Sequence, residues 1–220
     1  MTSTDTAAAP ARLVVFGAWY ISHAVAEAAE LSGWAVAGFV DPEPPERFAT
    51  LRSVPDDVAV IAAIGNNRLR AMVCGRLIEC GRRLVSIVHP SAIVSRSASV
   101  GPGCYLAENA VVRANATVGR GVFLNAGAIV SHDCRIGDFV TFGPTAATAS
   151  HVAVGRETTL GVGVSVRPRA RIGRDCVVGA GAAVVEDIGD GLTAVGVPAR
   201  GTARSPDAGK QSDWGANRVW

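Results

Sequence analysis

Apolar residues recur at every sixth position over almost half of this chain. The series begins at Val88 and ends at Val184, and sixteen of its seventeen members are apolar, Thr148 being the exception. Two positions before each member, from residue 92 to residue 182, lies another small or β-branched residue. Neither the 3.6-residue period of a helix nor the 2-residue period of a hairpin sheet produces a strict six, whereas a β-helix of six-residue repeats does.

Each six-residue repeat is expected to form one short strand and one turn, so that three repeats make a triangular coil of 18 residues. The 97 residues from 88 to 184 then form about 5.4 coils, stacked roughly 4.8 Å apart into a prism about 25 Å tall. The spacing never slips, which predicts a prism without long loops. Cys104, Cys134 and Cys176 occupy the small inward position and are expected to fill the core.

The chain before residue 88 alternates strand-like and helix-like segments instead. The strand-like segments are residues 13–17, 34–41, 58–65 and 84–88. Residues 21–33 and 66–81 have helical periodicity, with Leu31, Met72 and Cys80 among the residues expected to face the core. Such alternation predicts a small Rossmann-like parallel sheet covered by helices. The expected organisation is a flexible tail (1–11), a Rossmann-like acceptor-binding domain (12–88), the β-helix (89–202) and a second flexible tail (203–220).

Composition and charge exclude several classes of protein. Aromatic residues make up only 5% of the chain, and the net charge is +2 without a basic block, so neither nucleic acid nor a membrane surface is an expected partner. No apolar run approaches the roughly 20 residues that span a bilayer, and the first twelve residues lack the pattern of a signal peptide. Five cysteines without metal-type pairing fit reduced thiols in a cytoplasmic protein.

One histidine does not fit the repeat. His132 belongs to neither inward series, so it is expected to project from a turn, with Ser150 one coil above it and His151 one coil above Asp133. A histidine can remove a proton at neutral pH, and an adjacent aspartate can fix its tautomer. A backbone N–H near Ser150 could meet a developing oxyanion. A satisfied surface histidine is the alternative, and His151 competes with His132 for the role of base.

Four segments carry a resemblance to a known family: IAAIGNNRLR (61–70), IVHPSAIVS (87–95), VSHDCRIGDF (130–139) and GVPAR (196–200). Together they resemble the sugar acyltransferases of the sialic acid O-acetyltransferase and nucleotide-sugar N-acetyltransferase type, over about residues 12 to 202. The resemblance implies a left-handed β-helix and a homotrimer with active sites between subunits. It also implies that acetyl-CoA lies along a prism edge, with His132 as the base and Asp133 as its acidic neighbour.

The positions expected to bind the two substrates lie at turns and strand ends. Glycine and alanine at outer turns let a backbone edge approach pantetheine closely. The candidates for contact with the coenzyme are Ser150, Gly161, Val162, Gly179, Ala180 and Arg200. The candidates for contact with the acceptor are Gly17, Trp19, Tyr20, His23, Asp41, Asn66, Asn67 and His151.

The chain departs from the family pattern at two places. Trp19 and Tyr20 stand where relatives have a glycine-rich turn that admits a nucleotide phosphate, so an aromatic pair could stack on a base or sugar, or cover the pocket. Thr141 stands where many relatives carry a histidine. The reaction type is therefore better determined by the sequence than the acceptor.

The leading hypothesis is transfer of an acetyl group from acetyl-CoA to the amine of a nucleotide-linked amino sugar or a similar acceptor, by direct attack and without a metal. The alternatives are O-acetylation of a sugar hydroxyl, N-acylation of a non-nucleotide natural product, and a different acyl donor. A metal hydrase on the same prism would need about three converging histidines. A further alternative is an inactive trimeric scaffold whose first domain merely binds a ligand, and such a protein would cleave no thioester.

Overall fold

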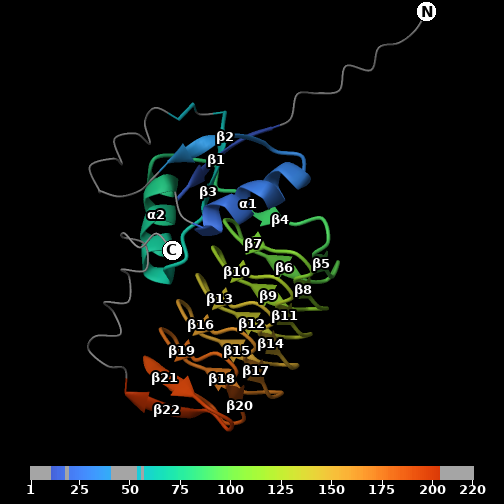
Figure 1. The fold of residues 1–220 in the computed structure, drawn as a ribbon, viewed down its shortest axis with the longest axis vertical. Helices are drawn as coiled ribbons and strands as arrows, with labels where there is room; N and C mark the ends of the chain where they lie inside the picture. Colours follow the sequence, from blue (N-terminus) through green and yellow to red (C-terminus); the bar gives the residue numbers. More distant parts are fainter. Residues whose placement is uncertain (1–10, 18–19, 41–53, 56, 204–220) are drawn as a thin grey trace, which may run out of the picture.

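The computed structural model describes residues 11–17, 20–40, 54–55 and 57–203. Trp19, Asp41 and most of the two predicted tails lie outside the described residues. Two bodies are visible in Figure 1: a small α/β domain, and a prism that extends from it to a terminal hairpin. This architecture confirms the predicted fold class.

The N-terminal domain is a three-stranded parallel sheet with the strand order β2-β1-β3. Its elements are β1 (Arg12–Phe16), α1 (Tyr20–Leu31), β2 (Ala35–Val40), β3 (Ala59–Ala62) and α2 (Asn67–Glu79). The expected fourth strand over 84–88 is wrong. Leu84 makes only an isolated bridge to Val60, and β4 (Ile87–Val88) pairs with the prism instead.

Three further expectations about helix faces are wrong. Met72 is 49% exposed and Leu31 is 58% exposed. Leu31 is the last residue of α1, and Cys80 caps the C-terminal end of α2 and is exposed. Leu31 and Cys80 lie at helix ends, beyond the surface that the sheet covers. Met72 lies in the middle of α2, whose buried face consists of residues 67, 70, 73, 74 and 77, so the predicted face was turned away from the true one.

The prism consists of two-residue strands on three parallel faces. Face 1 holds β4 (Ile87–Val88), β7 (Tyr105–Leu106), β10 (Phe123–Leu124), β13 (Thr141–Phe142), β16 (Thr159–Leu160) and β19 (Val177–Val178). Face 2 holds β5 (Ile93–Val94), β8 (Val111–Val112), β11 (Ile129–Val130), β14 (Ala147–Thr148), β17 (Ser165–Val166) and β20 (Ala183–Val184). Face 3 holds β6 (Ser99–Val100), β9 (Thr117–Val118), β12 (Arg135–Ile136), β15 (Ala153–Val154) and β18 (Arg171–Ile172).

Each strand of the prism pairs with the equivalent strand of the next coil, as Phe123 with Thr141 on face 1 and Arg135 with Ala153 on face 3. The second residue of each strand faces the core, together with the small residue two positions before it. The predicted inward cysteines are buried there. Val88 and Val94 are 36% and 37% exposed because they belong to the first coil, which has no coil before it.

The outward residues differ among the three faces. On face 1, Ile87, Tyr105 and Phe123 are buried in a cluster that includes Val25 and Ala29 of α1. Face 3 is mainly polar. On face 2 the outward residues are Ile93, Val111, Ile129, Ala147, Ser165 and Ala183, and Ile93 and Ile129 remain 64% and 38% exposed. Face 2 is therefore a mainly apolar surface that the other described elements leave uncovered.

Two features complete the fold. The antiparallel hairpin of β21 (Leu192–Val195) and β22 (Arg200–Ala203) extends face 1 at the far end of the prism. Among the described residues, neither helix has the length and apolar character needed to cross a membrane.

Candidate active site

The corner between faces 2 and 3 carries the residues that sequence reasoning singled out. Its turns stack one coil above another, and one residue of each turn has a left-handed backbone: Asn115 (φ 59°), Asp133 (φ 59°), His151 (φ 61°) and Arg169 (φ 63°). Asparagine, aspartate and histidine tolerate this conformation better than most residues. The repeat therefore aligns their side chains in a column along the prism edge, which we call the corner column.

His132 is hydrogen-bonded to the corner column through Asp133. Its Nδ1 donates a hydrogen bond of 2.7 Å to Oδ2 of Asp133, and the two side chains are 44% and 36% exposed. The other oxygen of Asp133, Oδ1, accepts a hydrogen bond of 3.1 Å from Nδ2 of Asn115, one coil earlier. Nε2 of His132 takes no part in either bond.

The charge of Asp133 is stabilised by these contacts. The hydrogen bond from His132 is the largest cause that lowers the pKa of the carboxyl below its usual value, and the hydrogen bond from Asn115 is the second. Since an unperturbed aspartate titrates near 3.9, Asp133 is a carboxylate throughout the neutral range. It can hold His132 in one tautomer and stabilise its protonated form.

The predicted stacking of the second histidine is confirmed. The N–H of His151 donates to the carbonyl oxygen of His132 at 3.1 Å, and Nε2 of His151 lies 3.8 Å from Oδ2 of Asp133. The two imidazole rings are 5.6 Å apart and edge to face, at 84°. Within the described part of the chain, the backbone N–H of the intervening Ser150 has no hydrogen-bond acceptor, as an oxyanion donor requires.

His132, Asp133 and His151 each offer a ligand atom, and these three atoms lie within 4.8 Å of one another. Two imidazoles and a carboxylate at this spacing are a donor set that a transition metal accepts. The metal hydrase considered from the sequence needs about three histidines, whereas two converge among the described residues of this corner.

The predicted coenzyme residues are divided between two corners. Val162 and Ala180 stack at the corner between faces 1 and 2, where the N–H of Gly181 donates to the carbonyl oxygen of Val162 at 2.8 Å. A Cβ atom on Gly161 would lie 2.7 Å from the N atom of Ala180, so the successive coils need glycine for their own packing. This corner borders the opposite edge of face 2 from His132, so one chain does not bring the two sets together.

Arg200 lies at the start of β22, and its guanidinium pairs with Glu186 at 3.3 Å. Glu186 occupies the corner of His132, three coils further along the prism. Arg200 is therefore the predicted coenzyme contact that shares an edge with His132 and Ser150.

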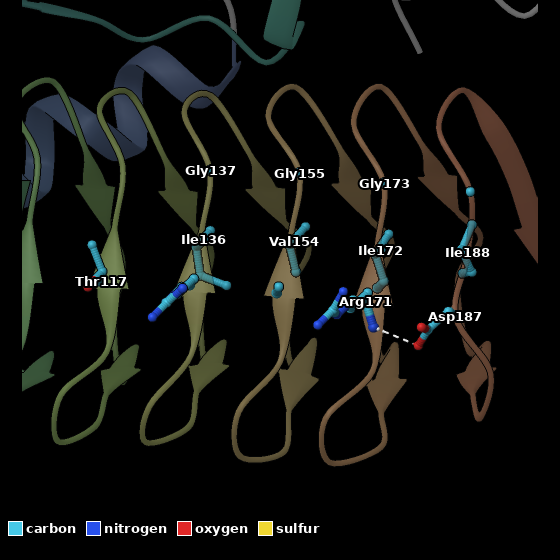
Figure 2. A pocket seen from close by; sticks show the side chains of 13 residues that line it. Thr117, Ile136, Gly137, Val154, Gly155, Arg171, Ile172, Gly173, Asp187 and Ile188 are labelled. Carbon is cyan, nitrogen blue, oxygen red and sulfur yellow. Dashed lines mark hydrogen bonds between the residues drawn. The ribbon is translucent and has the colours of Figure 1, made fainter.

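A hollow of about 590 Å³ lies on face 3. Small residues such as Gly137, Ala153 and Gly155 line it together with Ile136, Val154 and Ile172. Figure 2 shows Arg171 on its wall, where the backbone N–H of Arg171 donates to the Asp187 carboxylate at 2.9 Å. The sequence did not predict the hollow, which results from adjoining coils with small residues.

The acceptor candidates of the β1–α1 turn have different surroundings. Gly17 is buried with φ 132°, and a Cβ there would overlap the carbonyl oxygen of Ala63. Glycine thus lets the turn pack against β3. Tyr20 is 86% exposed, and the ring of the exposed His23 lies 5.3 Å from that of Phe39 at the end of β2.

The two asparagines that begin α2 have structural partners. The Asn66 side chain caps the helix by accepting from the N–H of Leu69 at 3.0 Å. Asn67 is only 7% exposed, and its Nδ2 donates to the carbonyl oxygen of Glu157 and to Thr159 Oγ1 at 3.1 and 3.0 Å. Little of Asn67 is left to contact an acceptor, and its side chain joins the two domains.

Sequence reasoning missed Arg70, which is fully buried between the domains. Its guanidinium donates to carbonyl oxygens of Gly121 and Ile64 at 2.9 and 2.6 Å, lies 4.1 Å from the Phe123 ring centroid, and donates to Oγ1 of Thr141 at 2.9 Å. Thr141 also donates to Asn67 Oδ1 at 2.6 Å. Helical periodicity could have indicated that Arg70 is buried, since residues 70, 73, 74 and 77 share one buried face of α2.

Comparison with known proteins gives consistent relatives. No family model matches the chain. A segment of 60 residues, 27% of this chain and 28% of the relative, is 40% identical to UDP-N-acetylbacillosamine N-acetyltransferase of Bacillus subtilis.

Two solved structures are similar over nearly their whole length. A perosamine N-acetyltransferase from Caulobacter crescentus, in complex with CoA and GDP-perosamine, is 35% identical and superposes with a TM-score of 0.82, over 87% of this chain and 97% of that one. The acetyltransferase domain of PglB from Neisseria gonorrhoeae, in complex with acetyl coenzyme A, is 30% identical with a TM-score of 0.82, over 88% and 100%. This chain belongs to the family of six-residue-repeat sugar N-acetyltransferases that these proteins represent.

Proposed function

We propose that this acyltransferase moves the acetyl group of acetyl-CoA to the amine of a nucleotide-linked amino sugar, with His132 as the general base. One observation supports the assignment of the base. Nδ1 of His132 donates a hydrogen bond of 2.7 Å to Asp133, which leaves Nε2 as the proton acceptor on an accessible corner. Relatives that hold CoA and GDP-perosamine support the two substrates.

The proposed reaction is a direct attack. The lone pair of the acceptor nitrogen forms a bond with the thioester carbon while Nε2 of His132 takes the nitrogen's proton. The free N–H of Ser150 donates to the oxyanion of the tetrahedral intermediate. The C–S bond then breaks, the sulfur leaves with its electron pair, and the proton held by His132 passes to the thiolate.

An acyl-enzyme on cysteine has little support. A nucleophilic cysteine needs an accessible thiolate. Burial raises the pKa of the Cys104 thiol to about 11, and Cys134 and Cys176 are buried in the prism core. All five thiols are free, from which we infer a cytoplasmic location.

The division of candidate residues between two corners supports a homotrimer. Both corners border face 2, whose outward Ile93 and Ile129 remain exposed. A second copy packed on this face would cover apolar surface and bring its Val162 corner towards the His132 corner of the first. We therefore propose that face 2 is the trimer interface and that each active site uses two chains.

The test is substitution of His132 by alanine and by glutamine. Release of free CoA is followed with acetyl-CoA and a panel of GDP-linked and UDP-linked amino sugars. Loss of a general base typically costs about 10²–10⁴-fold in rate, so both variants should lose turnover while they still bind the coenzyme. His89→Ala, at the domain junction, is the matched control. Retained turnover in the His132 variants would assign the base elsewhere, with His151 next.

A further inference from the structure

The Asp133 carboxylate is held from the previous coil, and this contact identifies a residue that the proposed mechanism does not use. Asn115 Nδ2 lies 3.1 Å from Oδ1 of Asp133, while Oδ2 of the same carboxylate accepts from His132 at 2.7 Å. We propose that Asn115 is a positioning residue for the transfer reaction: it fixes the Asp133 carboxylate so that Oδ2 faces His132 and keeps the proton of that imidazole on Nδ1. The inference rests on the proposed role of His132.

The carboxylate needs such a holder because of where it lies. Asp133 is at an exposed turn, with 36% of its side chain accessible. If the carboxylate turned away, His132 would be free to adopt either neutral tautomer, and only one of them offers Nε2 as a base. A hydrogen bond from a neutral amide fixes the second oxygen without adding a charge.

The backbone conformation of Asn115 aligns its side chain with that of Asp133. Its φ is 59°, the same as that of Asp133, so the two side chains leave equivalent positions on successive coils. The N–H of Asn115 donates to Oγ of Ser97 at 3.1 Å. Among the left-handed residues at the described turns of the prism, this asparagine and Asp133 make the side-chain hydrogen bond that joins one coil to the next.

The carboxylate is also approached from the following coil. His151 Nε2 lies 3.8 Å from the same Oδ2 that His132 contacts. Asp133 thus has an amide below it, one imidazole beside it and another above. Because His151 can carry a positive charge and Asn115 cannot, the amide is the contact that is independent of pH.

The chain provides a matched control for Asn115. Arg120 makes the same kind of contact at another corner: its Nε donates to Oδ2 of Asp138, one coil later, at 2.8 Å, and the two side chains are 53% and 36% exposed. This contact lies at the corner between faces 3 and 1, which does not border face 2. Replacing Asn115 or Arg120 by alanine removes a side-chain hydrogen bond from one coil to a carboxylate of the next, but it is Asn115 that contacts Asp133.

The experiment measures kcat and KM for Asn115→Ala and Arg120→Ala beside the wild type, with thermal unfolding of each. We expect Asn115→Ala to lower kcat about tenfold, with both KM values within about twofold, and Arg120→Ala to change kcat by less than about twofold. The ¹⁵N shifts of the His132 imidazole should report a single Nδ1–H tautomer in the wild type and Arg120→Ala, and a mixture in Asn115→Ala.

A third variant gives residue 115 a negative charge but keeps the shape of its side chain. Asn115→Asp places a second carboxylate beside Asp133, His132 and His151, and the added negative charge favours protonation of the imidazoles. The acid limb of kcat/KM should therefore move to higher pH in this variant and stay in place in Asn115→Ala.

The outcomes separate the two proposals. Equal kcat values and equal tautomers for the Asn115 and Arg120 alanine variants, in a protein that His132→Ala inactivates, would overturn the role of Asn115 alone. Activity in His132→Ala would overturn the proposed base, whatever the Asn115 variants do.

Discussion

At the scale of single residues, Asp133 shows how a repeat fold positions reactive groups without a deep pocket. The backbone period places Asn115, Asp133 and His151 one above another, and His132 reaches the middle member. The contacts of Asp133 come from its neighbour in the chain or from the equivalent positions of the adjoining coils. The site can therefore lie at an exposed corner and still be ordered.

The lowered pKa of Asp133 makes a prediction about pH. A depressed pKa in the folded state adds stability above the unfolded value near 3.9, and this stability is lost as the pH falls through the folded pKa. The hydrogen bond from His132 is the main cause of the shift. We expect Asp133→Asn to unfold at a lower temperature than the wild type at pH 5–7, and the difference to shrink as the pH falls below the unfolded value near 3.9.

The same variant tests the catalytic role of the charge. Asp133→Asn should reduce kcat at least about 100-fold, because the amide neither fixes the tautomer nor stabilises the imidazolium. Thermal unfolding from pH 2 to 8 and kcat at neutral pH are the two measurements. A variant that unfolds as the wild type does at every pH, with unchanged kcat, contradicts both expectations.

The sequence predicted this residue-scale arrangement well because it depends on local spacing alone. His132 and Ser150 at the turn, His151 above Asp133, and the cysteines inside all follow from counting in sixes and eighteens. Asn115 follows from the same count, since it lies one coil before Asp133, but its side-chain contact depends on the left-handed conformation of the turn. That conformation is not visible in a single asparagine.

At the scale of elements, α2 adds polar contacts between the two domains to the apolar contacts of α1, and these polar contacts could not be predicted. Asn67 was expected to contact the acceptor because it follows a strand end. In the structure its side chain contacts Glu157 and Thr159 of the prism. Thr141 of the prism is hydrogen-bonded to Asn67 and Arg70 of α2. These contacts depend on how one domain docks on the other, which no periodicity within either segment encodes.

The stability of this junction should depend on Arg70. Burial lowers its pKa to about 10, so it remains charged at neutral pH, and its donors are satisfied mainly by carbonyl groups of both domains. Arg70→Ala would leave these carbonyl groups without a donor. We expect a loss of about 3 kcal/mol, which for a chain of this size is a fall of roughly 6–12 °C in Tm.

Arg76 provides the control on the same helix. It pairs with Glu79 at 3.0 Å, with both side chains more than 60% exposed, so Arg76→Ala should change stability by less than about 1 kcal/mol. Calorimetry of both variants is the measurement. Similar melting temperatures for the two variants would show that the buried guanidinium does not hold the domains together.

At the scale of the whole molecule, the three faces of the prism have three different surroundings. Face 1 is covered over its first coils by the N-terminal domain, through Tyr105 and Phe123. Face 3 is polar and carries the hollow. Face 2 has a column of outward apolar residues on which no other described element packs. The six-residue count predicted which residues point outward, but not which face the first domain covers.

The proposed trimer should depend on the apolar surface of face 2. Ile93 is its most exposed isoleucine, at 64%, and lies two coils before the His132 turn. Ile93→Glu would bury a charge in the proposed interface, which is costly without a partner. Sedimentation velocity should detect a three-chain mass for the wild type and the 22.6 kDa single chain for the variant. Turnover should fall with the loss of trimer, because the Val162 corner of a second copy would no longer face His132.

Ser99→Glu is the matched control, since Ser99 is the outward, exposed residue of the next strand of the same coil, on face 3. It should keep the trimer and most of the activity. The interface and the shared site are tested separately by this pair. A dissociated Ile93→Glu variant that retained full turnover would place the coenzyme within one chain, most plainly in the hollow of face 3. An Ile93→Glu variant that remained a trimer would move the interface to another face.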